Sequence, residues 1–525
     1  MLDPEAPGVD RLREVLSSQG FLQTDLDGVL GVAFGPSHLR SDLPLYQRRL
    51  ASPTPLHTLV KLFGLYVDVP EEDARAAFAP LGLDEVVAMG LVERRDGLVR
   101  SRVGLVTTGD LVLARDRLVR EGAPLRPDHV IGLNPPAMQL GTITVRRPVR
   151  AALDLGCGGG VQALLAAGHA DRVVAVDVNP RALEFTRFNA RVNGIRNVEC
   201  RQGDFFAPVK GERFGLVVCN PPYAISPDAR FVFRDSGRPG DAVCEEVVSR
   251  IPHHLEEGGF ASVLCNWALR RDEAWSAPPM RWVEGSGCDA WLLGSGTKDP
   301  LSYAAGWNRN ADRDDYEAST DRWLAYYRKR EIEAIGMGAV ILRRRTGGQN
   351  WVRADQLPVD PVGRCHEQIL RVFAAEDLLS GLTDPDFLEQ VFAAGDDHRL
   401  YQTLARREGE YRVEAAELRL SGGFGFRGVA DGSTLEMLRR CNGRRPLRTI
   451  LSELAGLAGI DPETLATAAV PTVRRLVAMG FLLPAERRAE RRTSDGSNGE
   501  IATEANAPAE GVPRLGERVG AGSDR

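Results

Sequence analysis

The middle of the chain reads Val149-Arg150-Ala151-Ala152-Leu153-Asp154-Leu155, then Gly156-Cys157-Gly158-Gly159-Gly160, then an alanine-rich run from Val161 to Ala167. The apolar first segment predicts a buried strand, and the alanine-rich run predicts a helix. A strand, a glycine turn and a helix in this order bring a backbone close to a nucleotide-like ligand at the carboxyl edge of a sheet. The pattern therefore predicts a doubly wound α/β fold with a ligand site at the turn.

The glycine turn alone does not identify its ligand. Read from Gly158, it satisfies the looser dinucleotide form G-x-G-x-x-A, which ends at Ala163. The next predicted strand, Arg172 to Val176, ends in Asp177, which lies about twenty residues beyond the turn, where a ribose diol would be held. NAD and S-adenosylmethionine both carry that ribose, so Asp177 does not separate them.

A third strand end adds an acid and an aromatic ring. Val198 to Gln202 is predicted to be a short strand, and Gly203-Asp204-Phe205 closes it. A carboxylate and a ring at this place suit the amino group and the ring face of an adenine.

The most specific motif is Asn220-Pro221-Pro222-Tyr223, directly after the apolar run from Phe214 to Cys219. Neither proline can donate a backbone hydrogen bond, so the predicted strand stops there. The strand end then offers a carboxamide, free carbonyls and an exposed ring. These groups suit a flat substrate with an N–H group: Tyr223 can stack on its plane, while the Asn220 side-chain oxygen and the Pro221 carbonyl accept its hydrogens.

The chain holds a second copy of the first three letters, Asn134-Pro135-Pro136-Ala137. It has no apolar strand before it and no ring after it, so we interpret it as a plain turn.

Taken in order, these motifs resemble the class I S-adenosylmethionine-dependent methyltransferases that modify planar nitrogens, adenine N6 or glutamine N5. Release-factor glutamine methyltransferases and small-domain rRNA methyltransferases are members of this group. The resemblance covers roughly residues 128–345 and implies a Rossmann-like sheet of seven strands, with S-adenosyl-L-methionine as the cofactor.

The resemblance also implies a role for each motif residue. The loop cradles the methionine part of the cofactor, Asp177 holds the ribose, and the acid and ring of the third strand end hold the adenine. The Asn-Pro-Pro-Tyr segment binds the target nitrogen. The implied cofactor-binding residues are Asp154, Gly156, Gly158, Gly160, Asp177, Asp204, Phe205 and Asn220, and the implied catalytic residues are Asn220, Pro221, Pro222 and Tyr223.

The acceptor is the open question. Tyr223 and the loop Arg234-Asp235-Ser236-Gly237 favour a protein glutamine, as in release-factor methyltransferases. The alternative is adenine N6 in ribosomal or transfer RNA, and an alternative of another class is a non-catalytic RNA- or protein-binding scaffold with the same fold. The partner is accordingly a release factor, another ribosome-associated protein or an RNA.

The reaction expected is an in-line displacement that needs no strong base and no metal. We therefore expect the histidines to lie away from the motif edge: His129, His169, His253 and His254. Trp267 and Trp307 are predicted to fill the core rather than to stack on a base.

Composition limits the function further. The net charge of −6 and the pI near 5.9 give no support to strong nucleic-acid binding. None of the eight cysteines forms a C-x-x-C pair, which argues against structural zinc and a disulfide framework. No apolar run is long enough to cross a bilayer, so a cytoplasmic protein is expected.

The length of 525 residues suggests about three domains. We predict a helical, winged-helix-like module over residues 1–106, a methyltransferase domain over 107–346, a second helical, winged-helix-like module over 347–484 and a disordered tail over 485–525. The two modules share a segment, Val87-Ala88-Met89-Gly90-Leu91 in the first and Val477-Ala478-Met479-Gly480-Phe481 in the second. Each module either docks a substrate or only covers the catalytic unit.

Overall fold

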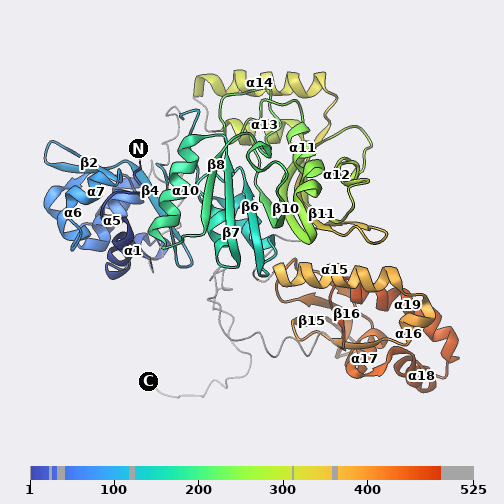
Figure 1. The fold of residues 1–525 in the computed structure, drawn as a ribbon. Helices are drawn as coiled ribbons and strands as arrows, with labels where there is room; N and C mark the ends of the chain where they lie inside the picture. The colour runs from blue at the N-terminus through green and yellow to red at the C-terminus, as the bar shows by residue number, and fades with distance from the viewer. Residues whose placement is uncertain are drawn as a thin grey trace, which may run out of the picture.

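The computed structural model describes residues 2–22, 26–31, 42–117, 125–309, 313–357, 363 and 365–485. The tail predicted to be disordered lies outside this set, apart from Ala485. Figure 1 shows three parts along the chain: a blue N-terminal part, a green and yellow centre built on one large sheet, and an orange C-terminal part.

The central sheet has eight strands in the order β13-β11-β12-β10-β9-β6-β7-β8. The strands from β8 to β10 run parallel, while β12 is antiparallel to both of its neighbours. The bounds are β6 Val149–Leu155, β7 Ala170–Asp177, β8 Val198–Gln202, β9 Phe214–Cys219, β10 Leu255–Leu269, β11 Cys288–Lys298, β12 Ala334–Arg344 and β13 Val352–Gln356. This is the doubly wound α/β fold that the glycine turn predicted.

The predicted seven-stranded core is present as β11-β12-β10-β9-β6-β7-β8. An eighth strand, β13, extends it: β13 joins the edge of the sheet, parallel to β11, and lies past residue 346. Its side chains alternate between exposed and half-buried, so it lacks the apolar run by which a buried strand is recognised in a sequence. The division of the chain into domains stays a prediction.

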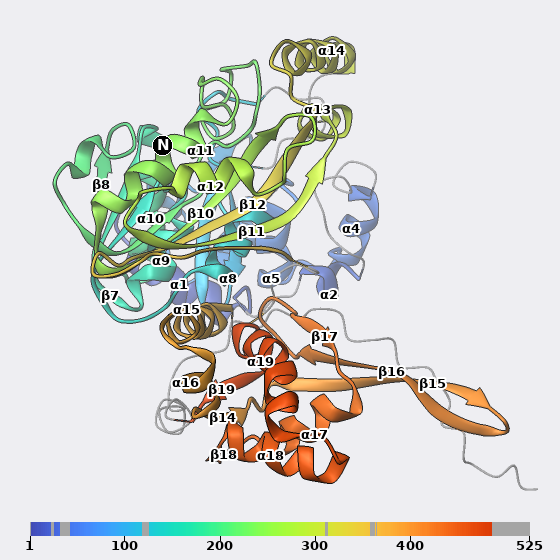
Figure 2. The same cartoon turned by 90° about the vertical axis from the view of Figure 1, so that its right-hand side faces the viewer.

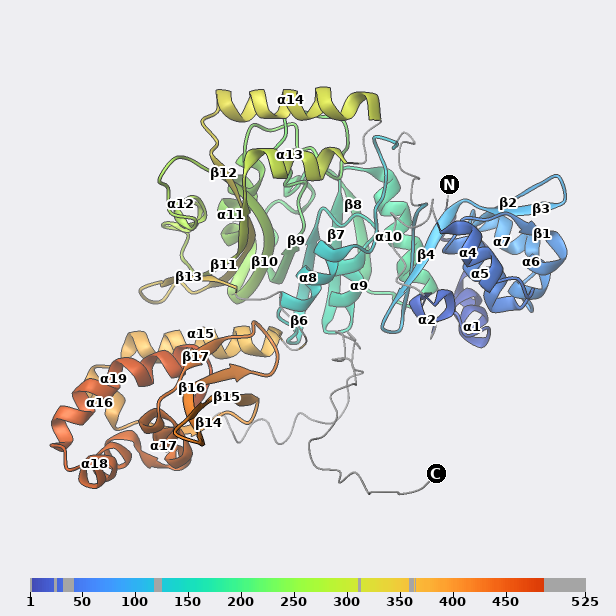
Figure 3. The same ribbon diagram turned by 180° about the vertical axis from the view of Figure 1, so that it is seen from behind.

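Helices cover both faces of the sheet because successive side chains of a strand point to opposite faces. Ala152 of β6 packs in one cluster with Leu140 and Leu164, while Leu153 packs in another with Val247. The first cluster lies under α8 and α9 (Figure 3), and the second lies under α11 and α12 (Figure 1). The bounds of the helices of the central part are α8 Pro135–Ile143, α9 Val161–Ala167, α10 Pro180–Val192, α11 Ala242–Arg250, α12 Ala277–Val283, α13 Pro300–Asn308 and α14 Arg313–Lys329.

The N-terminal part consists of helices followed by a small hairpin. The helices are α1 Val9–Ser18, α2 Leu26–Leu30, α4 Leu43–Arg49, α5 Pro55–Phe63, α6 Glu71–Phe78 and α7 Leu83–Ala88. The strands β2 (Val92–Arg95) and β3 (Leu98–Ser101) meet at a turn formed by Asp96 and Gly97, and β1 (Val69–Pro70) pairs with β3. A helix, a short strand, two helices and a hairpin form the arrangement expected of a winged helix.

The N-terminal part shares its core with the centre. Leu12 and Leu16 of α1 lie in one buried cluster with Phe185 and Phe188 of α10. A second hairpin, β4 (Val103–Thr108) with β5 (Leu111–Asp116), connects the two parts along the chain. Removal of the N-terminal part would therefore expose apolar surface on α10.

The C-terminal part is less helical than predicted. A long hairpin of β15 (His398–Arg407) and β16 (Glu410–Leu420), with β17 (Arg427–Val429) beside it, projects from the rest (Figure 2). Its outer residues are exposed and many are charged. They therefore lack the alternating apolar pattern that predicts a strand in a sequence.

The remaining elements of this part form a second helical unit around a small sheet ordered β18-β14-β19. Their bounds are α15 Cys365–Gly381, α16 Asp384–Leu388, β14 Val391–Ala394, α17 Gly432–Arg440, β18 Asn442–Pro446, α18 Leu447–Ala458, α19 Pro462–Ala478 and β19 Leu482–Pro484.

Candidate functional site

The ends of β6, β7, β8 and β9 meet at the carboxyl edge of the sheet around a cavity of about 490 Å³. This is the edge at which doubly wound sheets bind their ligands. Of the residues predicted from the sequence, those that line the cavity are Asp154, Gly156, Gly158, Asp177, Asp204, Phe205, Asn220 and Pro222. Three others lie outside the lining: Gly160, Pro221 and Tyr223.

The glycine loop is held as an open cradle by hydrogen bonds to the next strand. The backbone N–H groups of Gly156 and Cys157 donate to the carbonyl of Val176, at 2.8 and 3.0 Å. The N–H of Gly158 donates to Oδ2 of Asp177 at 2.8 Å. Gly160 adopts a φ of 81°, and a Cβ there would lie 2.8 Å from Cγ2 of Thr186. Glycine is therefore required at that position.

Asp154 is a buried carboxyl group at the end of β6. Its Oδ2 accepts the N–H of Ala163 in the first turn of α9, at 2.8 Å. Burial raises the pKa of Asp154 to about 7. A cationic ligand group beside Asp154 would favour the ionised form of its carboxyl group. The site therefore suits the ammonium group of an amino acid.

Asp177 ends β7 and is also nearly enclosed. Besides Gly158, it accepts the N–H of Asn179 on Oδ1 at 2.8 Å. Burial raises its pKa above the ordinary value. Each oxygen keeps a lone pair with which a ribose hydroxyl can bond.

At the end of β8, the Asp204 side chain is 68% exposed. Arg238 lies beside it, with its Nη2 3.5 Å from Oδ2 of Asp204 and its guanidinium carbon 5.3 Å from the centre of the Phe205 ring. Arg238 lines the cavity and was missed, because the sequence analysis considered the loop only up to Gly237. An acid, a ring and a guanidinium together suit a purine.

The fourth strand end carries Asn220, directly after β9. Its Oδ1 is enclosed and has no hydrogen-bond partner among the described residues. The Pro221 carbonyl accepts the N–H of Tyr223 at 2.8 Å, which leaves it one lone pair. The half-buried Tyr223 ring lies edge-to-face with Trp307, with 6.4 Å between ring centres and 69° between planes. Burial raises the pKa of its phenol above the ordinary value.

Two expectations about this edge are wrong. His129 does not lie away from it but lines the cavity, where its ring meets Phe233 at 6.2 Å. The segment that carries His129 is held there because Asn179 Nδ2 donates to the carbonyl of Asp128 at 3.0 Å. This contact joins residues far apart in the sequence, so no local pattern predicts it. Burial lowers the pKa of His129. Of the other three histidines, none is part of the lining.

The second error concerns Asn134, which is the N-cap of α8 rather than part of a plain turn. Its side chain accepts the N–H of Ala137 at 2.8 Å, and both prolines occupy the first helical positions, where no N–H is needed. Asn134 nevertheless lines the same cavity.

The tryptophan prediction is confirmed for Trp267, which is 1% exposed and packs in the core. Trp307 is only half-buried, and its ring contacts that of Tyr223 in the Asn-Pro-Pro-Tyr motif. Within the residues that the structure describes, no group of three or more His, Cys, Asp or Glu side chains is placed to hold a metal ion. Across the same residues, no helix is both long and apolar enough to cross a membrane.

Comparison with known proteins agrees with this geometry. A family model described as "Methyltransferase small domain" matches residues 138–275, and one described as "Domain of unknown function (DUF7059)" matches residues 18–102.

Similar curated proteins include several glutamine methyltransferases. The ribosomal protein uL3 glutamine methyltransferase of Bradyrhizobium diazoefficiens is 33% identical over 152 residues, which are 26% of this chain and 47% of that protein. The release factor glutamine methyltransferase of Escherichia coli is 34% identical over 130 residues, 22% of this chain and 46% of that protein. The one from Aliivibrio fischeri is 42% identical over 77 residues, 14% of this chain and 27% of that protein. The chain spans about half the length of these relatives, or less.

The strand order, the glycine cradle and the family match define the centre of the chain as a class I methyltransferase domain. Within that class, this domain is similar in sequence to release-factor and ribosomal-protein glutamine methyltransferases.

Proposed function

We propose that this chain is an S-adenosylmethionine-dependent N-methyltransferase that modifies a protein glutamine side chain. The observation that carries the proposal is the enclosed Oδ1 of Asn220, which has no partner among the described residues. Leaving a buried acceptor unpaired costs about 1–3 kcal/mol. An unpaired acceptor at the carboxyl edge of the sheet is most simply explained by a ligand whose N–H donates a hydrogen bond to it.

The cavity residues fit the cofactor. Asp154 and the glycine loop would hold the methionine part, Asp177 the ribose, and Asp204 with Phe205 the adenine. When bound, S-adenosylmethionine supplies a methyl group activated by the sulfonium charge. The structure contributes a preorganised cradle, because the loop hydrogen bonds to Val176 and Asp177 already hold it open.

An amide nitrogen is a poor nucleophile because its lone pair is delocalised into the carbonyl. Asn220 Oδ1 and the remaining lone pair of the Pro221 carbonyl would accept its two N–H hydrogens. This holds the amide with its lone pair directed toward the cofactor cavity, a contribution from orientation rather than from base strength. The proton released after methylation passes to solvent.

The choice of glutamine is supported by the relatives, which are named as glutamine methyltransferases acting on a release factor or a ribosomal protein. It is also supported by the net charge of −6, since an RNA-binding enzyme gains from positive charge. The partner we propose is a release factor or another ribosome-associated protein, met in the cytoplasm.

The test is tritium transfer from labelled S-adenosylmethionine into lysate of a strain that lacks the gene, so that its sites are unmethylated. Label should survive ribonuclease, disappear with protease, and chromatograph as N5-methylglutamine after complete digestion. Labelling should depend weakly on salt, whereas an RNA acceptor that engages several phosphates would lose affinity by orders of magnitude. Label recovered as N6-methyladenosine, or labelling undiminished by Asn220→Ala, would overturn the proposal.

A further inference from the structure

One wall of the cofactor cavity is a segment that belongs to neither a helix nor a strand. This wall segment, residues 127–132, contributes His129, Val130, Ile131 and Gly132 to the lining of the cavity. Its backbone groups have no partners within a regular element, so its position depends on the residues around it.

The first of these residues is Asp116, at the end of β5. Its backbone N–H donates to the Val130 carbonyl at 3.1 Å, and its Oδ2 accepts the Val130 N–H at 2.8 Å. Both Asp116 and Val130 are buried, so these hydrogen bonds are shielded from competing water. The hairpin that leads from the N-terminal part therefore holds the wall segment at Val130.

The second residue is Arg181, in the first turn of α10. Its Nη2 donates to Asp116 Oδ1 at 2.6 Å and its Nη1 to Asp116 Oδ2 at 2.8 Å, which makes a bidentate pair. The same Nη1 donates to the Asp128 carbonyl at 3.0 Å. This pair, which we call the clasp, binds the wall segment through both of its members.

Asn179 connects the wall segment to the residue assigned to the ribose. Its Nδ2 donates to the Asp128 carbonyl at 3.0 Å, and its backbone N–H donates to Asp177 Oδ1 at 2.8 Å. A displaced wall segment would break the first of these bonds and release the Asn179 side chain next to Asp177.

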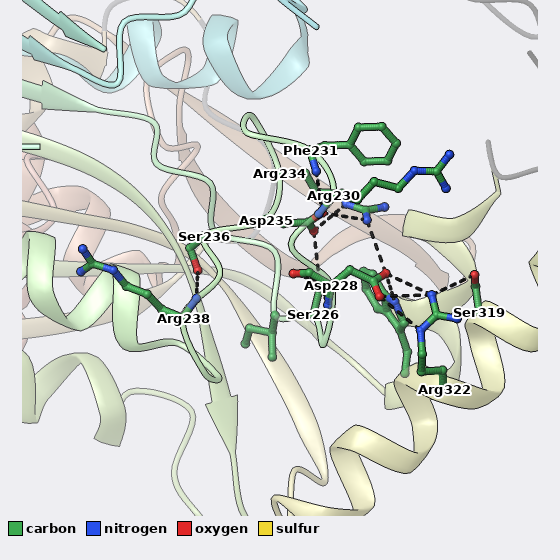
Figure 4. A network of polar contacts seen from close by, with 12 residues as sticks. Ser226, Asp228, Arg230, Phe231, Arg234, Asp235, Ser236, Arg238, Ser319 and Arg322 are labelled. Atoms are coloured by element: carbon green, nitrogen blue, oxygen red, sulfur yellow. Dashed lines mark hydrogen bonds and ion pairs between the residues drawn. The ribbon is translucent and has the colours of Figure 1, made fainter. Parts of the chain in front are cut away.

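The loop after the Asn-Pro-Pro-Tyr motif supports the start of the wall segment. The N–H of Val232 donates to the Pro127 carbonyl at 3.0 Å. This loop is rigid, because the fully buried carboxylate of Asp235 accepts the Phe231 N–H at 3.0 Å and Arg234 Nε at 2.7 Å. Figure 4 shows these groups gathered around Asp235. The wall segment is thus fixed at its start and depends on the clasp farther along.

A second cavity, of about 520 Å³, adjoins the wall segment. Asp116 and Arg181 line this second cavity, and His129 lines both cavities. At His129 the wall segment therefore lacks the close packing of a protein interior on its far side. It has room to withdraw from the cofactor cavity when the clasp is broken.

Resting on the proposed function, we infer that Asp116 and Arg181 are positioning residues of the cofactor site. Neither lines the cofactor cavity. They act through Val130 and Asp128, by holding the wall segment at the edge of that cavity. The clasp determines how tightly the cofactor is held, whereas the methyl transfer step does not depend on it.

The experiment measures binding of S-adenosylhomocysteine to the full chain by calorimetry. The variants are Asp116→Ala, Asp116→Asn and the double variant Asp116→Asn with Arg181→Gln, which leaves no unpaired charge. Asp68→Ala is the matched control, because Asp68 forms a bidentate pair with Arg100 at 3.0 and 2.7 Å and neither residue lines the cofactor cavity. Hydrogen exchange of the peptide that contains Val130 is followed in the ligand-free chain. Melting temperature is measured for every variant, and binding is compared well below it.

Asp116→Ala should raise the Kd for S-adenosylhomocysteine at least tenfold and accelerate exchange at Val130 without ligand. The KM for S-adenosylmethionine should rise in parallel, while kcat at saturating cofactor stays within threefold. Asp116→Asn, which keeps an acceptor for the Val130 N–H, should recover part of the affinity. The double variant should still raise the Kd at least tenfold, because the effect comes from the lost clasp and not from an unpaired charge. Asp68→Ala should bind within twofold of the wild type.

The inference is overturned if Asp116→Ala and the double variant bind as the wild type does, or if Asp68→Ala weakens binding equally. A loss confined to kcat, with Kd unchanged, would also overturn it. A wild-type chain that does not bind S-adenosylhomocysteine would refute the proposed function itself, and this inference with it.

Discussion

The chain contains the triplet Asn-Pro-Pro twice, and the two copies use the same carboxamide in opposite ways. At Asn134 the side-chain oxygen accepts the N–H of Ala137 and begins α8. At Asn220 the equivalent oxygen is enclosed and has no partner among the described residues. One oxygen is occupied by the fold, and the other remains available to a ligand.

The difference comes from what surrounds each copy. Asn220 follows β9, a fully buried strand that lies between β6 and β10 in the sheet. After it, the N–H of Tyr223 bonds back to Pro221 and the chain bridges to Asp235, so no helix forms to occupy the side chain. A triplet of residues becomes a site only where the strand before it delivers the carboxamide to the ligand edge.

The largest effect is expected for Asn220→Ala, which removes the available oxygen. Turnover should fall by about 10²–10³-fold, the usual cost of deleting one hydrogen-bond partner of the reacting group. Cofactor Kd, measured by calorimetry, should change by no more than twofold. If cofactor binding were lost instead, Asn220 would belong to the cofactor side and the contrast with Asn134 would fail.

Asp177 tests an intermediate case, because its oxygens bond to backbone N–H groups as Asn134 does and yet line the cavity. Asp177→Ala should weaken cofactor binding by about 1.5–3 kcal/mol, the range for hydrogen bonds to a charged group. It should also lower the melting temperature, since the Gly158 N–H loses its partner.

Asp177→Asn, which retains one acceptor oxygen, should recover part of both effects. Unchanged affinity in Asp177→Ala, or tight binding of NAD by the wild type, would refute the placement of the ribose at the end of β7.

Local patterns predicted the strand, glycine turn and helix of the centre, and they located the ends of β6 to β9 where the cavity lies. These elements have continuous apolar runs and glycines that only a tight turn needs. What the sequence did not reveal depends on contacts distant along the chain. His129 reaches the cavity through Asn179, and Trp307 reaches Tyr223 from α13.

Prediction from local sequence patterns is limited in the same way for the N-terminal and C-terminal parts. The hairpin β15–β16 has mostly exposed side chains and no apolar alternation. Deletion of residues 1–106 looks clean in the sequence, but Leu12 and Leu16 share a core with Phe185 and Phe188 of α10. Such a deletion would therefore also expose apolar surface of the methyltransferase domain, so its effect would not report on the N-terminal part alone.

The third prediction concerns Asp154, whose pKa burial raises to about 7. Below pH 7, the protonated form of Asp154 is therefore favoured in the ligand-free fold. The contribution of this carboxyl group to folding stability is lost as pH rises through 7. A ligand ammonium group needs the ionised form. Cofactor affinity should consequently rise about tenfold per pH unit below pH 7 and then level off.

Calorimetric titrations between pH 5.5 and 8.5 measure this dependence. In Asp154→Asn the slope should become flatter, and the residual slope would report Asp177, whose pKa is also raised. A wild-type affinity that falls with rising pH would contradict the assignment of Asp154 to the ammonium group.

The smallest effect is expected for Asn134→Ala, the counterpart of the first substitution. Loss of an N-cap costs about 1 kcal/mol of unfolding free energy, because the N–H of Ala137 loses its acceptor. Turnover at a temperature well below unfolding should stay within twofold, although Asn134 lines the same cavity as Asn220. Denaturant unfolding and initial rates, measured on one preparation, give the unfolding free energy and the turnover.

Asn134→Asp, which keeps a capping oxygen, should restore stability. A fall in turnover comparable to that of Asn220→Ala would show that both carboxamides serve the ligand, and the second copy would then be a site in its own right.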